Sequence, residues 1–121
     1  MNNILIAEDE KFLVRALKDN LEAEGYAVDT AMNGEEALER IRSRCPDLIL
    51  LDLLMPKQDG FFVIEGVRSN PKWEKIPIIV LSNLGSDSEI KRALELGAND
   101  YFVKSQHPIE EVIQKIKEYL A

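Results

Sequence analysis

The stretch Asp47-Leu48-Ile49-Leu50-Leu51-Asp52 carries the strongest structural signal in this chain, because four apolar residues run without interruption into a carboxylate. A short apolar run without polar alternation is typical of a strand buried on both faces of a parallel sheet. Three further runs also end at polar residues: 4–7 at Glu8 and Asp9, 78–81 at Ser82, and 101–103 at Lys104. If these runs are parallel strands, their polar ends gather at one sheet edge, where open α/β sheets bind ligands.

Segments with helical spacing alternate with the apolar runs along the chain. We expect strands near residues 3–7, 26–31, 48–51, 78–81 and 100–103, with a helix after each. A capping box at Ser86-Asp87-Ser88-Glu89 begins the fourth helix. The polar residues within 26–31 indicate an edge strand. The sequence therefore predicts one α/β domain over residues 1–121: a doubly wound five-stranded parallel sheet in the order 2-1-3-4-5, with flavodoxin-like (βα)5 topology.

Composition argues against several classes of function. The net charge of -7, from 15 basic and 22 acidic residues, disfavours non-specific binding to nucleic acids or anionic membranes. No apolar stretch approaches ~20 residues, and no secretory signal is visible. One cysteine, Cys45, and one histidine, His107, cannot build a disulfide framework or a zinc site. We therefore expect a cytoplasmic protein.

The three carboxylates predicted at the sheet edge require a cation or a shifted pKa. Two carboxylates ~4 Å apart repel by ~4 kcal/mol at an effective dielectric constant of about 20. Oxygen ligands beside a phosphate suit Mg²⁺. Lys104 adds a second positive charge at the same edge, beside the predicted cation. Together these two positive groups can hold one further anion, for which phosphate is the obvious candidate. Asp52 could also be a nucleophile, since carboxylates form aspartyl phosphates.

Five segments resemble those of a known family, in order and at the right spacing. They are Ile4 to Asp9, Asp47 to Asp52, Met55 to Gly60, Ile76 to Ser82 and Gly97 to Lys104. On these motifs the chain resembles, over its whole length, the response-regulator receiver domains of two-component signalling. The resemblance implies a phosphoprotein of a phosphorelay. The output of the domain would be a small shift of helix four, strand five and helix five. The coupling free energy between this shift and phosphorylation would be ~1–3 kcal/mol.

The resemblance also implies a role for each acidic residue. Asp52 would accept a phosphoryl group from a phosphohistidine on a sensor histidine kinase or a phosphotransfer protein. Glu8, Asp9, Asp52 and the backbone carbonyl of Leu54 would hold Mg²⁺ (or Mn²⁺). Glu8 is one methylene longer than the aspartate that is frequent there, so it could reach the metal through water.

Three further residues would act on the attached phosphoryl group. Lys104 would pair with its oxygens, Ser82 would donate a hydrogen bond to one of them, and Tyr101 matches the aromatic whose rotamer follows that hydroxyl. With Asp52, Lys104 and Ser82 form the predicted catalytic set of a self-catalysed transfer, which is not a conventional enzyme. The downstream partner would be a protein target or a fused output domain, with no direct contact to nucleic acid or membrane. A homodimer through helix four, strand five and helix five is compatible with the resemblance.

Departures from the family's pattern surround the phosphorylation site. Ser105 stands where the family usually has a proline joined through a cis peptide. A non-proline cis bond costs ~2.5–4 kcal/mol, so we expect a trans bond or an altered loop. Asn83 replaces a common small residue. Leu54 and Leu84, each two residues beyond a site residue, are apolar, and we hypothesise that they change the access of the attacking water.

Other interpretations of the same residues remain open. Taken singly, Asp9 could cap a helix, Asp52 could begin a turn, and Tyr101 could be an ordinary strand aromatic. A receiver-like interaction module that works without phosphorylation would fit the altered residues. A small phosphohydrolase usually has a second acid where Leu54 stands, and an FMN binder should show a Ser/Thr/Gly-rich loop after the first strand. The last helix ends with the chain, which fits a stand-alone regulator or the receiver part of a longer protein.

Overall fold

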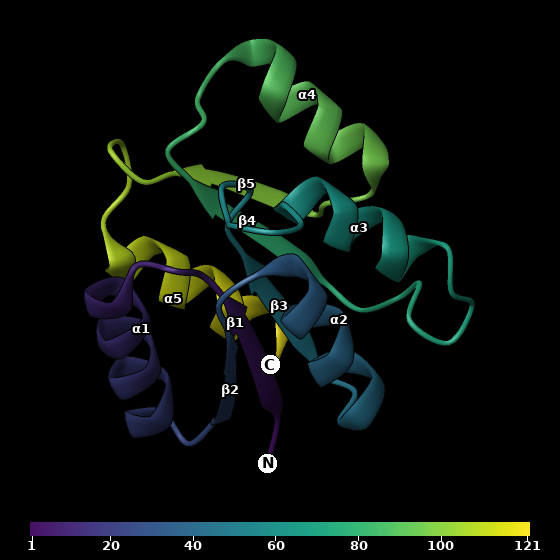
Figure 1. The fold of residues 1–121 in the computed structure, drawn as a ribbon. Coiled ribbons are helices and arrows are strands. Elements are labelled where there is room, and N and C mark those ends of the chain that lie inside the picture. The colour runs from purple at the N-terminus through teal and green to yellow at the C-terminus, as the bar shows by residue number, and fades with distance from the viewer.

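The computed structural model describes residues 1–121 and contains one parallel sheet. Its strands are β1 (Asn3–Ala7), β2 (Ala27–Ala31), β3 (Leu48–Leu51), β4 (Ile78–Ser82) and β5 (Asp100–Val103). They lie in the order β2-β1-β3-β4-β5, and every neighbouring pair is parallel (Figure 1). The predicted fold class, strand order and edge position of the second strand are therefore confirmed.

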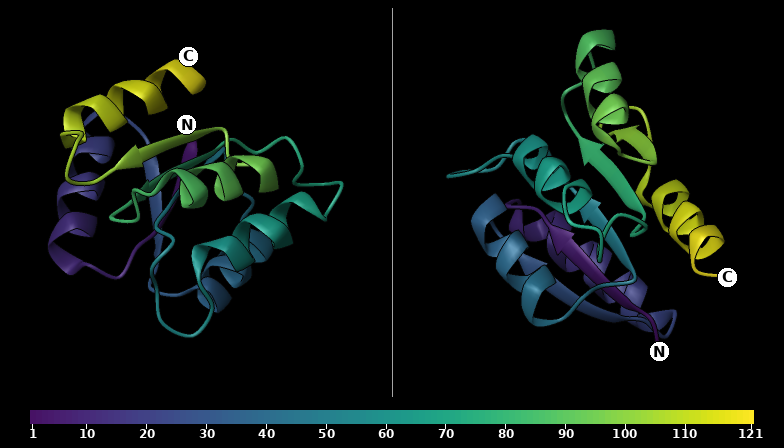
Figure 2. Two further views of the ribbon diagram at one scale, coloured as in Figure 1. Left: turned by 90° about the horizontal axis from the view of Figure 1, so that it is seen from above. Right: turned by 90° about the vertical axis from the view of Figure 1, so that its right-hand side faces the viewer.

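Five helices cover the two faces of this sheet. They are α1 (Lys11–Ala23), α2 (Gly34–Ser43), α3 (Gly60–Arg68), α4 (Asp87–Leu96) and α5 (Ile109–Tyr119). Buried residues of α1 and α5 share one hydrophobic cluster, and those of α2, α3 and α4 share another. Figure 2 shows this division at β4 and β5, where α4 and α5 lie on opposite sides of the strands. None of these helices is long and apolar enough to cross a membrane.

The uninterrupted apolar runs of β3 and β4 result from this covering on both faces. In β3, Ile49 and Leu51 point into the cluster beneath α2, α3 and α4, whereas Leu48 and Leu50 point into the cluster beneath α1 and α5. All four side chains are at most 2% exposed. Each such side chain contributes ~1.5–3 kcal/mol by burial, so the central strands hold the site edge rigidly.

Most helices begin with a side-chain cap close to the sheet edge. Asn33 caps α2, Asp59 caps α3, and Ser86 caps α4 in the predicted capping box with Glu89. In each case a side-chain oxygen accepts a hydrogen bond from a backbone N–H of the first turn, which satisfies a donor that has no partner in the helix. These caps fix where the loops before α2, α3 and α4 end.

Candidate functional site

The register of the strands brings the predicted site residues together. Ala7 is aligned with Leu51, Leu51 with Val80, and Ser82 with Val103. Just beyond these positions, the N–H of Asp52 donates to the carbonyl of Ala7 at 2.9 Å. The N–H of Lys104 donates to the carbonyl of Ser82 at 2.8 Å, so the ladder continues to the site residues.

The three predicted carboxylates form a cluster at this edge. Glu8, Asp9 and Asp52 each offer an oxygen, and these oxygens lie within 4.8 Å of one another. Glu8 is 3% exposed and Asp52 4% exposed. Asp9 does not cap α1, because Glu10 occupies the cap position. Burial and the neighbouring charge of Asp52 help to raise the pKa of Glu8 to about 7, against the hydrogen bond from Lys104.

Lys104 lies among these carboxylates. Its Nζ is 3.1 Å from Asp52 Oδ2, 2.9 Å from Glu8 Oε1 and 2.5 Å from Glu10 Oε2. Burial alone lowers the pKa of Lys104, but its hydrogen bonds to Glu10 and Glu8 and the charge of Asp52 raise it above its ordinary value. The ammonium therefore stays charged and partly neutralises the cluster.

Ser82 and Tyr101 are connected through the backbone of Leu84. The hydroxyl of Ser82, which is fully buried, accepts a hydrogen bond from the N–H of Leu84 at 3.3 Å. The hydroxyl of Tyr101 donates to the carbonyl of Leu84 at 2.5 Å. Tyr101 is half-buried against the core, and burial followed by the charges of Glu89 and Asp52 raises its pKa. One residue of the β4–α4 loop thus contacts both side chains.

The loop after β3 places Leu54 beside Asp52. The N–H of Leu54 donates to Asp52 Oδ1 at 3.1 Å, so Asp52 does stabilise a turn, one of the roles considered from sequence. The Leu54 side chain is 50% exposed. Together with Asp9, Phe61, Leu84 and Arg92, Leu54 lines a hollow of about 670 Å³ between this loop and α4. The predicted role of its carbonyl as a metal ligand stays a prediction.

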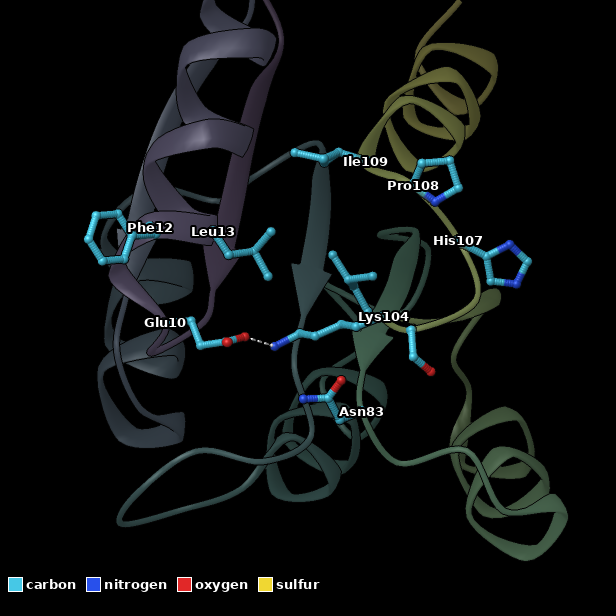
Figure 3. Close-up of a pocket in the computed structure, with 10 residues that line it drawn as sticks. Glu10, Phe12, Leu13, Asn83, Lys104, His107, Pro108 and Ile109 are labelled. Atoms are coloured by element: carbon cyan, nitrogen blue, oxygen red, sulfur yellow. Dashed lines mark hydrogen bonds and ion pairs between the residues drawn. The ribbon is translucent and has the colours of Figure 1, made fainter.

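A second hollow lies beside Lys104. This groove, of about 500 Å³, is bordered by the start of α1 and the β5–α5 loop and includes Glu10, Phe12, Asn83, Ser105 and His107 (Figure 3). Phe12 is 94% exposed and points away from the core. The chain contains no cis peptide bond, so the expected trans bond between Lys104 and Ser105 is confirmed.

The donor set of the cluster fits a hard divalent cation. Glu8, Asp9 and Asp52 supply only carboxylate oxygens, and no sulfur or imidazole nitrogen belongs to the group. Mg²⁺ and Mn²⁺ prefer such oxygen ligands. A cation there would replace part of the charge neutralisation that Lys104 supplies in this structure.

Glu10 is the one residue of the site that sequence analysis did not assign a role. It pairs with Lys104 across 94 positions of the chain. The sequence carries no signal for this pairing, because an acid directly before a helix is expected to interact with the helix N-terminus. The partner of Glu10 depends on the fold.

The chain is similar in sequence to known regulators. A family model described as the response regulator receiver domain matches residues 4–117. The phosphate regulon transcriptional regulatory protein PhoB of Rhizobium meliloti (strain 1021) is 45% identical over 101 residues, which are 84% of this chain and 44% of that protein. The chain thus spans less than half the length of this relative.

Solved structures agree with the observed fold. A putative response regulator from Chloroflexus aurantiacus J-10-fl is 34% identical, with a TM-score of 0.89 over 98% of this chain and 97% of that one. The Mn²⁺-bound form of response regulator Rcp1 is 27% identical, with a TM-score of 0.88 over 99% and 94% of the two chains. With the family model matching nearly the whole chain and the sheet edge carrying the expected residues, this chain belongs to the response regulator receiver domain family.

Proposed function

We propose that this domain accepts a phosphoryl group on Asp52 from a phosphohistidine of a sensor histidine kinase or phosphotransfer protein. The observation that carries the proposal is the position of the Lys104 ammonium, 3.1 Å from Asp52 Oδ2 and beside the cluster of Glu8 and Asp9. A buried nucleophilic carboxylate with a fixed cation at its side is suited to receive a transferring phosphoryl group.

In the proposed step, a carboxylate oxygen of Asp52 attacks phosphorus. The new O–P bond forms as the P–N bond of the phosphohistidine breaks, and the bonding electron pair stays on the imidazole nitrogen. The negative charge on the phosphoryl oxygens would be met by Lys104. Such a transfer depends on positioning and charge neutralisation, which is why we class the domain as a self-catalysed acceptor rather than a conventional enzyme.

Glu8, Asp9, Asp52 and the carbonyl of Leu54 would hold a divalent cation, Mg²⁺ or Mn²⁺, during this transfer. When bound, the cation supplies charge neutralisation between the carboxylates and the phosphoryl oxygens. The acidic cluster supports this assignment, because its three oxygens lie close together and are only partly neutralised by Lys104.

Ser82 and Tyr101 would report the phosphorylated state. If the rotamer of Ser82 changes so that its hydroxyl reaches and donates to a phosphoryl oxygen, Oγ moves away from the N–H of Leu84 and the hydrogen bond between them is lost. The β4–α4 loop would then shift, and with it the carbonyl of Leu84, which accepts the hydrogen bond from Tyr101. Movement at this point would pass to α4 and β5, and with α5 this face would contact an output domain, a protein target or a second copy of the domain.

The phosphodonor would approach over the groove beside Lys104. Phe12 stands exposed at its border, and the polar side chains of Asn83 and Ser105 line it. Phenylalanine is enriched at protein–protein interfaces, so contact of Phe12 with the donor protein fits this approach. The cytoplasmic location expected from the sequence stays a prediction.

The decisive experiment is an intact-mass measurement after incubation with acetyl phosphate and Mg²⁺, and separately with a phosphorylated histidine kinase. Wild type should gain one phosphoryl group, and Asp52→Asn should gain none. Omission of the divalent cation should also abolish the gain. If no donor modifies the wild-type chain, phosphoryl transfer is ruled out, and an interaction module that works without phosphorylation becomes the better explanation.

A further inference from the structure

The ammonium of Lys104 has no hydrogen-bond donor to spare. A lysine ammonium has three N–H donors, and three carboxylate oxygens lie within 3.1 Å of Nζ, from Glu8, Glu10 and Asp52. Its side chain is only 12% exposed. Any further anion that pairs with Lys104 must therefore displace one of these three partners.

Glu10 differs from the other two partners of Lys104. In the proposed function, Glu8 is a metal ligand and Asp52 is the acceptor, so both are engaged during transfer. Glu10 belongs to neither group, its side chain is 57% exposed, and it reaches Lys104 across the groove from the start of α1 (Figure 3). It is the partner that stays in direct competition with an incoming phosphoryl group.

The start of α1 supplies independent support for a dedicated role of Glu10. Glu10 occupies the N-cap position, yet its side chain makes no capping hydrogen bond. The first turn of α1 also lacks acidic residues and begins with Lys11, although a helix N-terminus favours negative charge. Each of the other four helices has a side-chain cap or acidic residues in its first turn. The carboxylate of Glu10 is directed at Lys104 instead of at its own helix.

We propose that Glu10 is a positioning residue that acts as a latch: it holds Lys104 in the unphosphorylated protein and competes with the phosphoryl group for the ammonium. This inference rests on the proposed function, because the competitor is the phosphoryl group on Asp52. Pairing of Lys104 with the phosphoryl group therefore competes with its ion pair to Glu10, and the latch sets how readily the phosphorylated state forms.

Two substitutions separate the latch from a simple charge effect. Glu10→Gln removes the charge but keeps the length, whereas Glu10→Asp keeps the charge and shortens the side chain by one methylene, about 1.5 Å, which breaks the contact with Lys104. Glu22→Gln, at an exposed acid of the same helix, is the matched control for net charge.

The first measurement uses the unphosphorylated protein without metal. Lysine ammonium NMR of ¹⁵N-labelled protein reports the order parameter of Lys104 Nζ, with the signal assigned by its loss in Lys104→Arg. We expect a restrained ammonium in wild type and in Glu22→Gln, and a more mobile one in Glu10→Gln and Glu10→Asp. A Lys104 signal that is equally restrained in all four proteins would overturn the latch.

The second measurement is titration with beryllofluoride and Mg²⁺, a phosphoryl mimic that cannot be transferred, followed by amide chemical shifts. Both Glu10 variants should bind it about two- to fivefold more tightly than wild type, as expected for loss of a partly exposed competing ion pair. Tighter binding by Glu10→Gln alone would indicate a charge effect and reject the latch. If wild type and all variants fail to bind the mimic, the proposed function itself is wrong, an outcome that the lysine signal distinguishes from failure of the latch.

Discussion

Leu54 and Leu84 place apolar side chains on the two loops that flank Asp52. Both line the hollow between the β3–α3 loop and α4, and Leu54 is the more exposed of the two. An apolar wall cannot hydrogen-bond a water molecule, so it offers no fixed position from which water could attack a phosphoryl group. The residues at these two positions should therefore control how long the phosphoryl group survives.

We expect Leu54→Asn and Leu84→Glu to lose the phosphoryl group several-fold faster than wild type, because each introduces a polar group able to hold the attacking water. Decay of the phosphorylated mass after removal of acetyl phosphate measures this rate. Leu94→Asn, at an exposed leucine of α4, is the control for introducing a polar residue. Equal decay in all four proteins would contradict the hypothesis.

Whether the sequence could predict a feature of a single residue depended on whether that feature arises from neighbouring residues in the chain or from a distant segment. The trans bond at Ser105 could be predicted, because its cause is the energy of one peptide bond. The pairing of Lys104 with Glu10 could not, since it depends on the distance between two loops at opposite ends of the chain.

At the level of elements, short-range signals placed the helices and strands well. The capping box at Ser86 begins α4, and β3 spans the predicted residues 48–51. The sequence did not reveal that the loop after β3 is held by another element. The N–H of Gly34, at the start of α2, donates to the carbonyl of Gln58 at 2.8 Å, close to Lys57 with its left-handed backbone (φ 64°).

This contact leaves no room for a side chain at Gly34. A Cβ there would lie 2.4 Å from the carbonyl oxygen of Gln58, and backbone cannot move aside cheaply. Gly34→Ala should therefore lower the free energy of unfolding by about 1–3 kcal/mol. Glu35→Ala, one residue further along the helix and exposed, should stay within about 0.5 kcal/mol of wild type. Urea unfolding measures both, and similar values for the two variants would show that the contact is not tight.

At the level of the whole molecule, Glu8 connects the site with stability and pH. Its pKa in the folded protein is about 7, above the ordinary 4.5, so the metal-free fold favours protonated Glu8. The stabilisation that results is complete below about pH 4.5 and is lost as pH rises through 7. A divalent cation needs the ionised carboxylate, so its binding changes with pH in the opposite direction.

We accordingly expect the Mg²⁺ affinity to fall by up to about tenfold for each pH unit below 7 and to level off above it. Thermal unfolding at several Mg²⁺ concentrations between pH 5 and 8 measures this, because a ligand of the folded state raises the melting temperature. Glu8→Gln should bind Mg²⁺ more weakly, and its Mg²⁺ affinity should change little with pH. The same pH dependence of Mg²⁺ affinity in wild type and in Glu8→Gln would show that another group binds the competing proton.

The order of the elements, the edge position of β2 and the gathering of Glu8, Asp52 and Lys104 at one sheet edge follow from the sequence itself. These features arise from the alternation of apolar runs and helical segments, which determines which residues are buried. Short right-handed connections between the strands then favour this parallel topology. Only the tertiary structure decided that Glu10 binds Lys104 and that Leu84 contacts both Ser82 and Tyr101. These contacts depend on side-chain rotamers and on separations of a few ångströms between distant segments, which the hydrophobic pattern does not encode.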